Sequence, residues 1–411
     1  MVATTQAMDT AGAAAARAFD LLAIPQSFLD DPYPTYALLR RHDPVHRNPD
    51  GSYFLTRYRD IVQVYRDPRM SSDKTVEFRP KFGDGPLYEH HTTSLVFNDP
   101  PLHTRVRKLL AAAFTPRALA ALEPRVVALV DGLLDAAEAR GEFDLIGDFA
   151  SALPVELICD MLGVPRPDRG PLREWAQIIL SALEPVTTPV MVDAGDRAVA
   201  DFSDYLRRLI AERRRRPSND AADILGTLAF GEIDGERLTE PELIHNCIFL
   251  LNAGHETTTN LIGNGVAALL DHPGERARLA ADPGLIRSAV EEFLRYESSN
   301  QLGNRRVAED AEVGGVALPA GTYIHIGIGA ANRDPEEFPD PDRLDIGRAP
   351  NRHLAFGSGA HACLGMSLAR IEGRVAIGAL VARFPDLRPA GTPIRGGRAR
   401  FRGYSAYPVA A

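Results

Sequence analysis

Residues 356–370 read Phe-Gly-Ser-Gly-Ala-His-Ala-Cys-Leu-Gly-Met-Ser-Leu-Ala-Arg. From Leu364 onward apolar side chains recur near helical spacing until Phe384-Pro385 ends the run, which predicts a helix with Cys363 at its N-terminal end. The unpaired backbone N–H groups and the helix dipole at such an end favour an anionic sulfur. We therefore interpret the stretch as a loop that presents a thiolate.

Three glycines, Gly357, Gly359 and Gly365, flank this cysteine. They remove side chains on both sides of it, so a flat macrocycle could lie against the backbone. A single thiolate bound to iron on one face of the macrocycle fits this pattern. The alternative is that Cys363 is a small buried hydrophobic residue in a turn.

The pattern Phe-x-x-Gly-x-x-x-Cys-x-Gly, with Phe356, Gly359, Cys363 and Gly365 in register, resembles the haem-binding signature of the cytochrome P-450 superfamily. The resemblance implies that Cys363 is the proximal haem ligand, a thiolate whose electron release favours O–O cleavage. It also implies haem b and a mainly α fold with small β-sheets. The haem is expected between a long central helix and the helix of the cysteine loop.

Composition limits the class of protein. The chain has 411 residues with no visible linker or repeat, so we expect a partly disordered lead over residues 1–28 and a single domain over 29–411. A hydrophobic content of 45% suffices for a sizeable core, and a net charge of -9 argues against nucleic acid as a partner.

Cellular location is inferred from the cysteines and the N-terminus. The three cysteines, Cys159, Cys247 and Cys363, are far apart and make no disulfide or metal spacing, which favours a reducing cytoplasm. The N-terminus has neither a membrane-spanning apolar run nor a signal peptide pattern. We therefore expect a soluble cytoplasmic monomer that binds no membrane.

Most of the chain is expected to be helical. A hairpin turn, Asn48-Pro-Asp-Gly51, separates two strands because glycine supplies the positive φ. Residues 71–94 are expected to form a functional loop because of their length. Further strands are expected over 311–318 and 322–328, and helices around 36–39 and over 59–65, 119–140, 144–162, 171–183 and 193–216.

A central helix of about 30 residues, or about 45 Å, is predicted between the capping box Thr239-Glu-Pro-Glu242 and the stop Asp271-His-Pro273. Its middle reads Ala253-Gly-His-Glu-Thr-Thr-Thr259, a polar interruption in an apolar helix. The alternative is that the threonines only bond back to carbonyl groups and bend the helix.

The interruption is similar to the superfamily's Ala-Gly-x-Asp/Glu-Thr-Thr motif, in which the helix opens beside the haem iron. The resemblance implies that Ala253 and Gly254 contact haem, and that Glu256 and Thr257 relay protons to bound dioxygen. It implies no role for Thr259.

Four cations are candidates for the haem propionates. His103 and Arg107 lie four residues apart after Asp99-Pro-Pro, where a solvated helix face is the alternative. The match to the superfamily's Asp-Pro-Pro-x-His-x-x-x-Arg pattern implies that they bind a propionate. By the same resemblance Arg305, seven residues before Glu312, and His361 complete the set, with Arg306 left open as an alternative to Arg305.

Glu292 and Arg295 form an i,i+3 pair that alone indicates an ordinary ion pair. The pair resembles the superfamily's Glu-x-x-Arg motif, which stabilises the haem pocket together with a later arginine. That arginine is expected to be Arg343, in Phe338-Pro-Asp-Pro-Asp-Arg343.

The resemblance implies a haem monooxygenase that inserts one oxygen atom of O2 into a small organic substrate. No flavin or iron–sulfur domain is present in the sequence, so electrons are expected from NAD(P)H through a reductase and a [2Fe–2S] ferredoxin. The alternatives are a peroxide-using peroxygenase and a haem-binding sensor without turnover, and Glu256 with Thr257 argues against both. A third alternative, a helical scaffold with a structural cysteine, would bind no haem.

The remaining candidates are contact residues. Candidate substrate contacts are Phe78, Phe82, Leu87, Leu250, Ala253, Asn300, Gln301, Leu302 and Asn304, and candidate ferredoxin contacts are Lys108 and Arg370.

Overall fold

The computed structural model describes residues 2–217, 223–232 and 235–411. They form two compact units that alternate along the sequence. The first unit comprises Met1–Ser71, Ala267–Cys363 and Arg395–Gly403, and the second comprises Ser72–Val266, Leu364–Ile394 and Tyr404–Ala411. The prediction of one domain over residues 29–411 stays a prediction.

The first unit contains most of the β-structure. Its elements are α1 (Val2–Arg17), α2 (Gln26–Asp30), α3 (Tyr33–His42), β1 (Val45–Arg47), β2 (Tyr53–Leu55), α4 (Tyr58–Arg66), β3 (Met70–Ser71), α14 (Pro273–Ala281), η5 (Pro283–Leu285), α15 (Ile286–Tyr296), β5 (Leu302–Val307), β6 (Ala311–Val313), β7 (Val316–Leu318), β8 (Tyr323–Gly327), α16 (Ile328–Ala331) and η6 (Gly359–His361).

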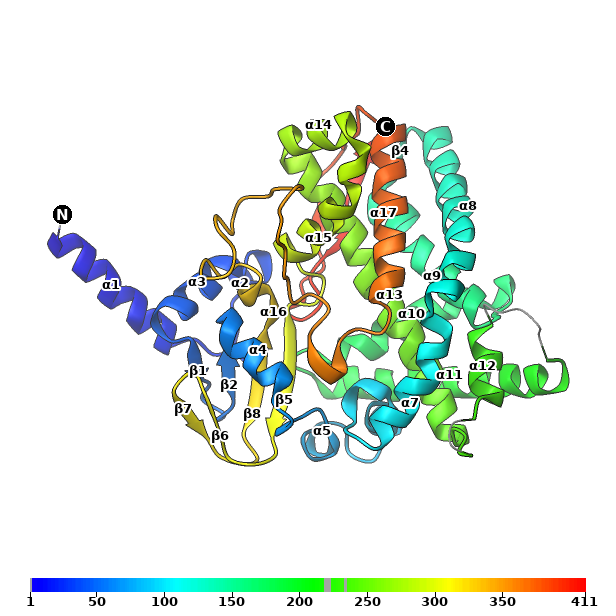
Figure 1. Ribbon diagram of the computed structural model, residues 1–411, viewed down its shortest axis with the longest axis horizontal. Coiled ribbons are helices and arrows are strands. Elements are labelled where there is room, and N and C mark those ends of the chain that lie inside the picture. Colours follow the sequence, from blue (N-terminus) through cyan, green and yellow to red (C-terminus); the bar gives the residue numbers. More distant parts are fainter. Residues whose placement is uncertain (1, 218–222, 233–234) are drawn as a thin grey trace. The chain divides into compact units, whose positions relative to one another are not determined.

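A five-stranded sheet in the order β1-β2-β8-β5-β3 organises this unit (Figure 1). The predicted hairpin is confirmed, since β1 and β2 pair antiparallel and Gly51 has a φ of 87°. Strand β8 pairs parallel with β2 and antiparallel with β5, so Phe54 and Asn304 both face His325 in register. One face of the sheet is buried by a cluster that includes Leu55, Ile324 and Ile326.

The second unit is almost entirely helical. Its elements are α5 (Thr75–Phe82), α6 (Pro86–Thr93), η1 (Leu95–Phe97), α7 (Leu102–Ala111), η2 (Ala112–Phe114), α8 (Pro116–Arg140), β4 (Glu142–Asp144), the π-helix η3 (Leu145–Ala150), α9 (Ala152–Met161), η4 (Arg166–Asp168), α10 (Gly170–Ser181), α11 (Pro189–Arg215), α12 (Ile224–Phe230), most of α13 (Glu240–Asp271), α17 (Met366–Arg383), β9 (Arg388–Pro389), β11 (Tyr404–Ala406) and β12 (Pro408–Ala410), while β10 (Ile394–Arg395) joins the two units in sequence.

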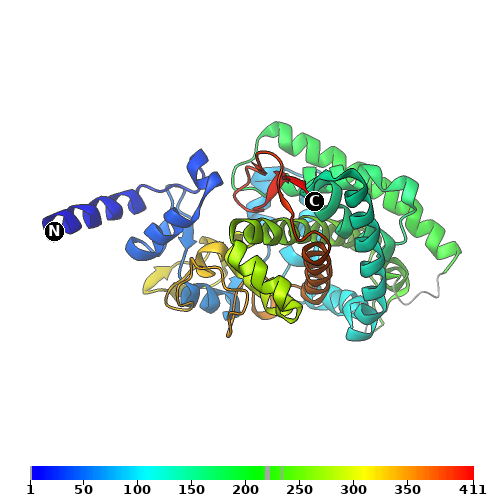
Figure 2. The same ribbon diagram turned by 90° about the horizontal axis from the view of Figure 1, so that it is seen from above.

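Helices α8 and α17 lie side by side in this unit, as both views show (Figures 1 and 2). Their contact buries Val126, Val130 and Leu134 of α8 and Ile377 and Leu380 of α17. Ion pairs from Arg383 to Glu138 and Asp135 and from Arg374 to Glu123 link the exposed edges of the two helices, so α17 is fixed along its length.

The predicted central helix is α13, which has 32 residues. Its capping box is confirmed: the Thr239 N–H donates to Glu242 Oε2 over 2.8 Å, and the Glu242 N–H donates to Thr239 Oγ1 over 3.4 Å. The helix is assigned helical throughout, and nearly all of its side chains from Leu243 to Leu269 are buried. A helix in this position must satisfy its polar side chains internally.

Several elements differ from the sequence-based expectation. Residues 71–94 contain helices α5 and α6 rather than one long loop, and residues 311–318 fold into the hairpin β6-β7 around Gly314 and Gly315, which both have positive φ. Helix α17 begins at Met366, so Cys363 precedes the helix by three residues. Helix α1 fills much of the expected disordered lead, because its alanine-rich run has the highest helix propensity.

The prediction of a mainly helical chain with small sheets is confirmed. Within the part of the chain that the structure describes, no helix is both long enough and apolar enough to cross a membrane.

Helix α17 also contains a buried carboxyl group. Glu372 is 3% exposed, and its Oε2 has no hydrogen-bond partner among the described residues. Burial raises the pKa of Glu372 from 4.5 to about 8, so the side chain is mostly protonated at neutral pH.

This carboxyl group predicts a pH-dependent stability. Between pH 4.5 and about 8 the folded protein keeps a proton on Glu372 that the unfolded chain releases, so the free energy of unfolding falls as pH rises through this window. We expect Glu372→Gln to raise that free energy by up to about 4 kcal/mol above pH 8 and to change it little near pH 4.5. Urea unfolding at both pH values measures the difference.

The control is Glu123→Gln on α8, whose side chain is 46% exposed. It should change stability by less than about 1 kcal/mol at either pH. An equal effect of Glu372→Gln at both pH values would show that burial does not shift this pKa.

Candidate active site

The loop before α17 holds Cys363 by backbone contacts of the first unit. The Cys363 N–H donates to the carbonyl of Phe356 over 2.8 Å. Gly359 has a φ of 72°, and a Cβ there would lie 2.4 Å from the carbonyl oxygen of Tyr65, so only glycine fits. Gly357 also has a positive φ, of 65°. The glycines are therefore required by the turn that positions Cys363.

The three cysteines differ in environment. Cys159 and Cys247 are fully buried, and burial raises the pKa of each thiol to about 12. Both therefore stay protonated at neutral pH, whereas a metal ligand must be a thiolate. Cys363 is half-buried. It is the cysteine best suited to bind a metal.

Tyr65 connects Arg305 with the glycine loop inside the first unit. The Arg305 guanidinium lies 5.4 Å from the centre of the Tyr65 ring, and Gly357 and Gly359 both approach Tyr65. Arg305 also donates from Nη1 to the Asn304 carbonyl over 2.7 Å. Successive side chains of a strand point to opposite faces, so Arg306 points away from this group. The choice of Arg305 over Arg306 as a propionate ligand stays a prediction. His361 ends η6 in the same loop.

In the second unit, α7 carries His103 and Arg107 one turn apart. His103 is 3% exposed, Arg107 is half-buried, and the adjacent Lys108 is exposed. The carboxylate of Asp99 accepts from the Ser72 N–H over 2.9 Å, which fixes the start of the helix. The helix thus presents an imidazole and a guanidinium group one turn apart.

A stripe of half-exposed residues interrupts the buried surface of α13. Phe249, Ala253, Gly254 and Thr257 are the half-exposed positions between Leu243 and Leu269. Their spacing of four residues places Phe249, Ala253 and Thr257 on one face of the helix. A Cβ at Gly254 would meet only Ile158, at 3.9 Å. This face of the central helix therefore borders open space.

A polar stripe runs beside it. Asn252, Glu256, Asn260 and Asn264 follow one another at intervals of four and are all less than 9% exposed. Asn260 donates from Nδ2 to Glu256 Oε1 over 3.4 Å. A buried carboxylate thus lies in a polar row next to the open face.

The threonines bond back to the helix. The Thr257 hydroxyl donates to the Ala253 carbonyl over 2.8 Å, and the Thr259 hydroxyl donates to the His255 carbonyl over 2.9 Å. For Thr259 this bond gives the buried hydroxyl the hydrogen-bond partner that it needs. Thr257 differs because the residue is half-exposed and belongs to the open face.

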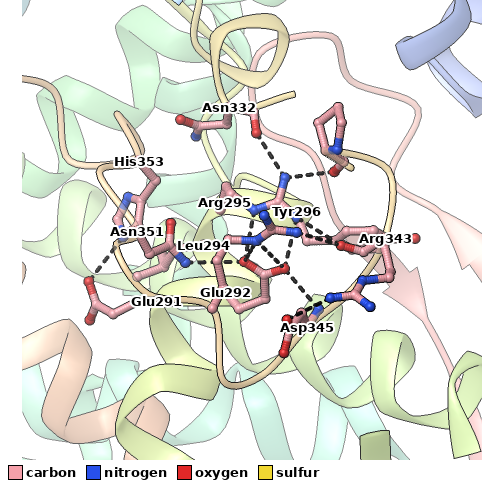
Figure 3. Close-up of polar contacts among 12 residues, drawn as sticks. Glu291, Glu292, Leu294, Arg295, Tyr296, Asn332, Arg343, Asp345, Asn351 and His353 are labelled. Atoms are coloured by element: carbon pink, nitrogen blue, oxygen red, sulfur yellow. Dashed lines mark hydrogen bonds and ion pairs between the residues drawn. The ribbon is translucent and has the colours of Figure 1, made fainter. Parts of the chain in front are cut away.

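The Glu292–Arg295 pair is fully buried, with both side chains 0% exposed. The Arg295 guanidinium donates to both carboxylate oxygens over 2.8 Å and to the carbonyls of Asn332 and Pro341 (Figure 3). The Glu292 carboxylate also accepts from Asn351 Nδ2 over 3.1 Å. The pair links α15 to the irregular segment before the cysteine loop.

The prediction that Arg343 completes this pair is wrong. The Arg343 side chain is 67% exposed and pairs with Asp345, and only its carbonyl accepts from Arg295 and Arg348. Arg348 completes the group instead, since its Nε donates to both oxygens of Glu292 over 3.1 and 3.2 Å. Arg348 thus adds two charge-assisted hydrogen bonds to a carboxylate that Arg295 already neutralises.

Two of the predicted substrate contacts have structural roles. Leu302 packs in a core cluster with Phe28 and Tyr36, and Gln301 donates to the Ser298 carbonyl over 2.8 Å and to the Tyr33 hydroxyl over 3.3 Å. Both are 0% exposed. The predicted contacts that no observation tests are Asn300, Asn304, Phe78, Phe82, Leu87 and Leu250.

Comparison with known proteins identifies the family. The family model for cytochrome P450 matches residues 176–282 and 284–392. A vitamin D(3) 25-hydroxylase from Pseudonocardia autotrophica is 44% identical over 365 residues, with 88% of each chain covered. The cytochrome P450 monooxygenase PikC from Streptomyces venezuelae is 42% identical over 376 residues, with 90% of this chain and 87% of PikC covered.

A crystal structure of P450BioI, in complex with an acyl carrier protein ligated to hexadec-9Z-enoic acid, superposes with a TM-score of 0.88. It is 35% identical, and the match covers 94% of this chain and 100% of P450BioI. The chain belongs to the cytochrome P450 family. The predicted resemblance and the predicted P450 fold are both confirmed, and this P450 is a monooxygenase that uses haem and O2.

Each unit by itself contains residues that suit a haem group. The first unit has a half-buried thiol on a turn that only glycine permits. The second unit has an imidazole and a guanidinium one turn apart on α7 and an open face on α13. A Cβ at Gly365 would meet only Phe114, at 4.0 Å, so a flat group could also approach the backbone there.

Sequence reasoning missed Arg348 and Tyr65. Arg348 follows Arg343 by five residues, and no local pattern separates the two. Tyr65 occupies an ordinary helix end, and its contact with Gly359 depends on the tertiary fold. The one signal in the sequence was the run of glycines in the loop. Glycines that adopt a positive φ often lie where another backbone segment comes close, as Tyr65 does here.

Removal of the Arg348 side chain tests the corrected assignment. Arg348→Ala should lower the free energy of unfolding by about 3 to 5 kcal/mol, because it leaves part of the buried Glu292 charge uncompensated. Arg343→Ala is the control and should cost less than about 1 kcal/mol, since its ion pair is largely exposed. Denaturant unfolding measures both variants, and equal losses would contradict the assignment.

Proposed function

We propose that this P450 binds haem b through the Cys363 thiolate and inserts one oxygen atom of O2 into a small organic substrate. The observation that supports this most directly is the contrast between the three thiols. Burial holds Cys159 and Cys247 protonated, and Cys363 alone is half-buried on a glycine turn.

Four cations are proposed to hold the haem propionates, namely His103, Arg107, Arg305 and His361. Buried carboxylates without cationic partners are costly, so each propionate needs at least one of these side chains. The proposed van der Waals contacts of the haem are Ala253, Gly254, Phe356, Gly357 and Gly365.

When bound, the haem supplies the activation of dioxygen and the oxidation of the substrate. The chain supplies protons. Glu256 is the proposed acid, because it is a carboxyl group beside the open face of α13, and Asn260 orients it by a hydrogen bond. Thr257 is the proposed proton donor into the open face, since the residue is half-exposed and its hydroxyl needs only to rotate away from the Ala253 carbonyl.

The presence of both Glu256 and Thr257 favours turnover with O2. A peroxygenase using peroxide, or a haem sensor without turnover, needs no acid and hydroxyl beside the haem. We therefore retain the monooxygenase proposal over these two alternatives.

Electrons are proposed to come from NAD(P)H through a reductase and a [2Fe–2S] ferredoxin. Lys108 is exposed on α7 and Arg370 lies in the second turn of α17, so both are proposed contacts for an acidic ferredoxin. We further propose that this P450 is a cytoplasmic monomer, which a small ferredoxin in the same compartment could reach.

The relatives indicate hydrophobic substrates. One relative is named for hydroxylation of vitamin D(3), and P450BioI was solved with a long-chain fatty acid on a carrier protein. We propose that this P450 also accepts an elongated hydrophobic molecule, with Phe78, Phe82, Leu87, Leu250, Asn300 and Asn304 as candidate contacts.

Replacing Cys363 tests the ligand. Cys363→Ser should abolish the red-shifted Soret band of the reduced carbon monoxide complex, because a hydroxyl is not the soft anionic ligand that produces it. Cys247→Ala is the matched control and should keep the band, since its thiol is fully buried and protonated. Retention of the band in Cys363→Ser would refute the proposed function.

Replacing Thr257 tests proton delivery. Thr257→Ala should keep the substrate-induced change in the ferric haem spectrum and the consumption of NAD(P)H, while hydrogen peroxide replaces most of the hydroxylated product. The ratio of product to NAD(P)H measures this coupling. Thr259→Ala is the control, because its hydroxyl bonds only to the His255 carbonyl. If Thr257→Ala were as well coupled as the parent, Thr257 would only bend the helix.

A further inference from the structure

Three histidines of the second unit form a buried cluster that has no role in the site described above. His90 and His91 lie in α6, and His245 lies near the start of α13. The ring centres of His90 and His91 are 5.0 Å apart, and those of His90 and His245 are 5.6 Å apart. Their exposed fractions are 2%, 1% and 5%.

His91 is surrounded by aromatic rings. The centres of the Phe78, Phe82 and Phe97 rings lie 5.5, 5.4 and 5.4 Å from that of His91. Neither ring nitrogen of His91 has a hydrogen-bond partner among the described residues. Because an imidazole buried in this way loses its bonds to water, it requires a partner from a ligand or a bound water.

The ring nitrogens of the two neighbouring histidines can also form further hydrogen bonds. His245 Nε2 lies 3.7 Å from Glu89 Oε1, whereas its Nδ1 has no partner among the described residues. His90 Nδ1 has only a long contact, of 3.5 Å, to the Ser94 hydroxyl. The cluster therefore offers several polar ring atoms to one incoming group.

The charge state and hydrogen-bonding groups of the three imidazoles indicate which ligand group the cluster would bind. Burial lowers the pKa of all three histidines, to about 3 for His91, so the rings are neutral at pH 7. A neutral imidazole has one N–H donor and one nitrogen acceptor. A hydroxyl group can use both, whereas an ether can use only the donor.

A ridge of side chains on α13 connects the cluster with the open face. His245, Phe249, Ala253 and Thr257 follow one another at intervals of four, so they form a continuous ridge that winds by about 120° around the helix from His245 to Thr257. At 1.5 Å per residue, His245 is about 12 Å from Ala253 and about 18 Å from Thr257 along the helix axis. An elongated molecule that follows this ridge would therefore reach the histidines with its far end.

We propose that His91, assisted by His90 and His245, is a specificity-determining site that binds a hydroxyl group at the far end of an elongated hydrophobic substrate. Phe78, Phe82 and Phe97 surround the carbon next to that hydroxyl. The inference rests on the proposed function, because it assumes that oxidation takes place near Thr257.

Matched probes test this site in the haem-containing protein. Dodecanol, dodecyl methyl ether and dodecanoic acid share one alkyl chain and differ in the terminal group. Titration of the ferric haem spectrum gives a dissociation constant for each probe. We expect the parent protein to bind dodecanol at least about fivefold more tightly than the ether, and His91→Phe to weaken dodecanol binding about tenfold while leaving the ether within about twofold.

Two further variants separate hydrogen bonding from packing. His91→Asn keeps one donor and one acceptor, so it should retain the preference for dodecanol over the ether. Phe82→Leu removes part of the aromatic surface and should weaken all three probes alike. Each variant is used only after it gives the normal carbon monoxide spectrum, so a loss of folding is not mistaken for a loss of binding.

The outcomes are distinct. Equal binding of dodecanol and its ether by the parent protein, or equal weakening of all probes by His91→Phe, would overturn the proposal and leave His91 as a packing residue. Preferential loss of dodecanoic acid would overturn the choice of a hydroxyl. In all these cases the carbon monoxide spectrum of the parent protein would still report separately on Cys363 and the proposed function.

Discussion

The conformation of the irregular segment before Cys363 depends on the hydrogen bonds that it makes to one buried carboxylate group. Glu292 is fully buried, and it accepts hydrogen bonds from Arg295, Arg348, Asn351 and the backbone N–H of Asp345. Apart from Arg295, these donors come from an irregular segment that has no helix or strand of its own. The cost of an unpaired buried charge therefore fixes that segment in one conformation, and the segment leads directly into the loop of Cys363.

Local signals in the sequence were sufficient for the elements that local interactions determine. The glycines around Cys363 are required by a backbone that only glycine adopts, so their spacing alone indicated the turn. The capping box of Thr239 and Glu242 fixes the start of α13 through contacts within four residues. The same holds for the hairpin at Gly51, whose φ is positive.

Tertiary contacts decided the rest, and the sequence could not supply them. Arg343 and Arg348 lie in the same irregular segment, and only the fold determines that Arg348 turns inward. Leu302 was expected near substrate, but it packs on side chains more than 250 residues earlier in the chain, such as Phe28. Helices α5 and α6 are too short to be stable alone, so their packing against other helices, rather than their propensity, forms them.

Helix α13 has to meet two opposed requirements. Burial over most of its length demands apolar side chains, whereas the proposed proton delivery demands a carboxyl and a hydroxyl in the middle. The helix separates the two: Asn260 of the polar row donates a hydrogen bond to Glu256, and the adjacent face of Ala253 and Thr257 stays open. The Thr257 hydroxyl has a partner within the helix, the Ala253 carbonyl, whereas the buried ring nitrogens of His91 have no partner among the described residues. The proposed substrate hydroxyl would supply that partner, so one elongated molecule would connect the histidine cluster with the middle of the helix.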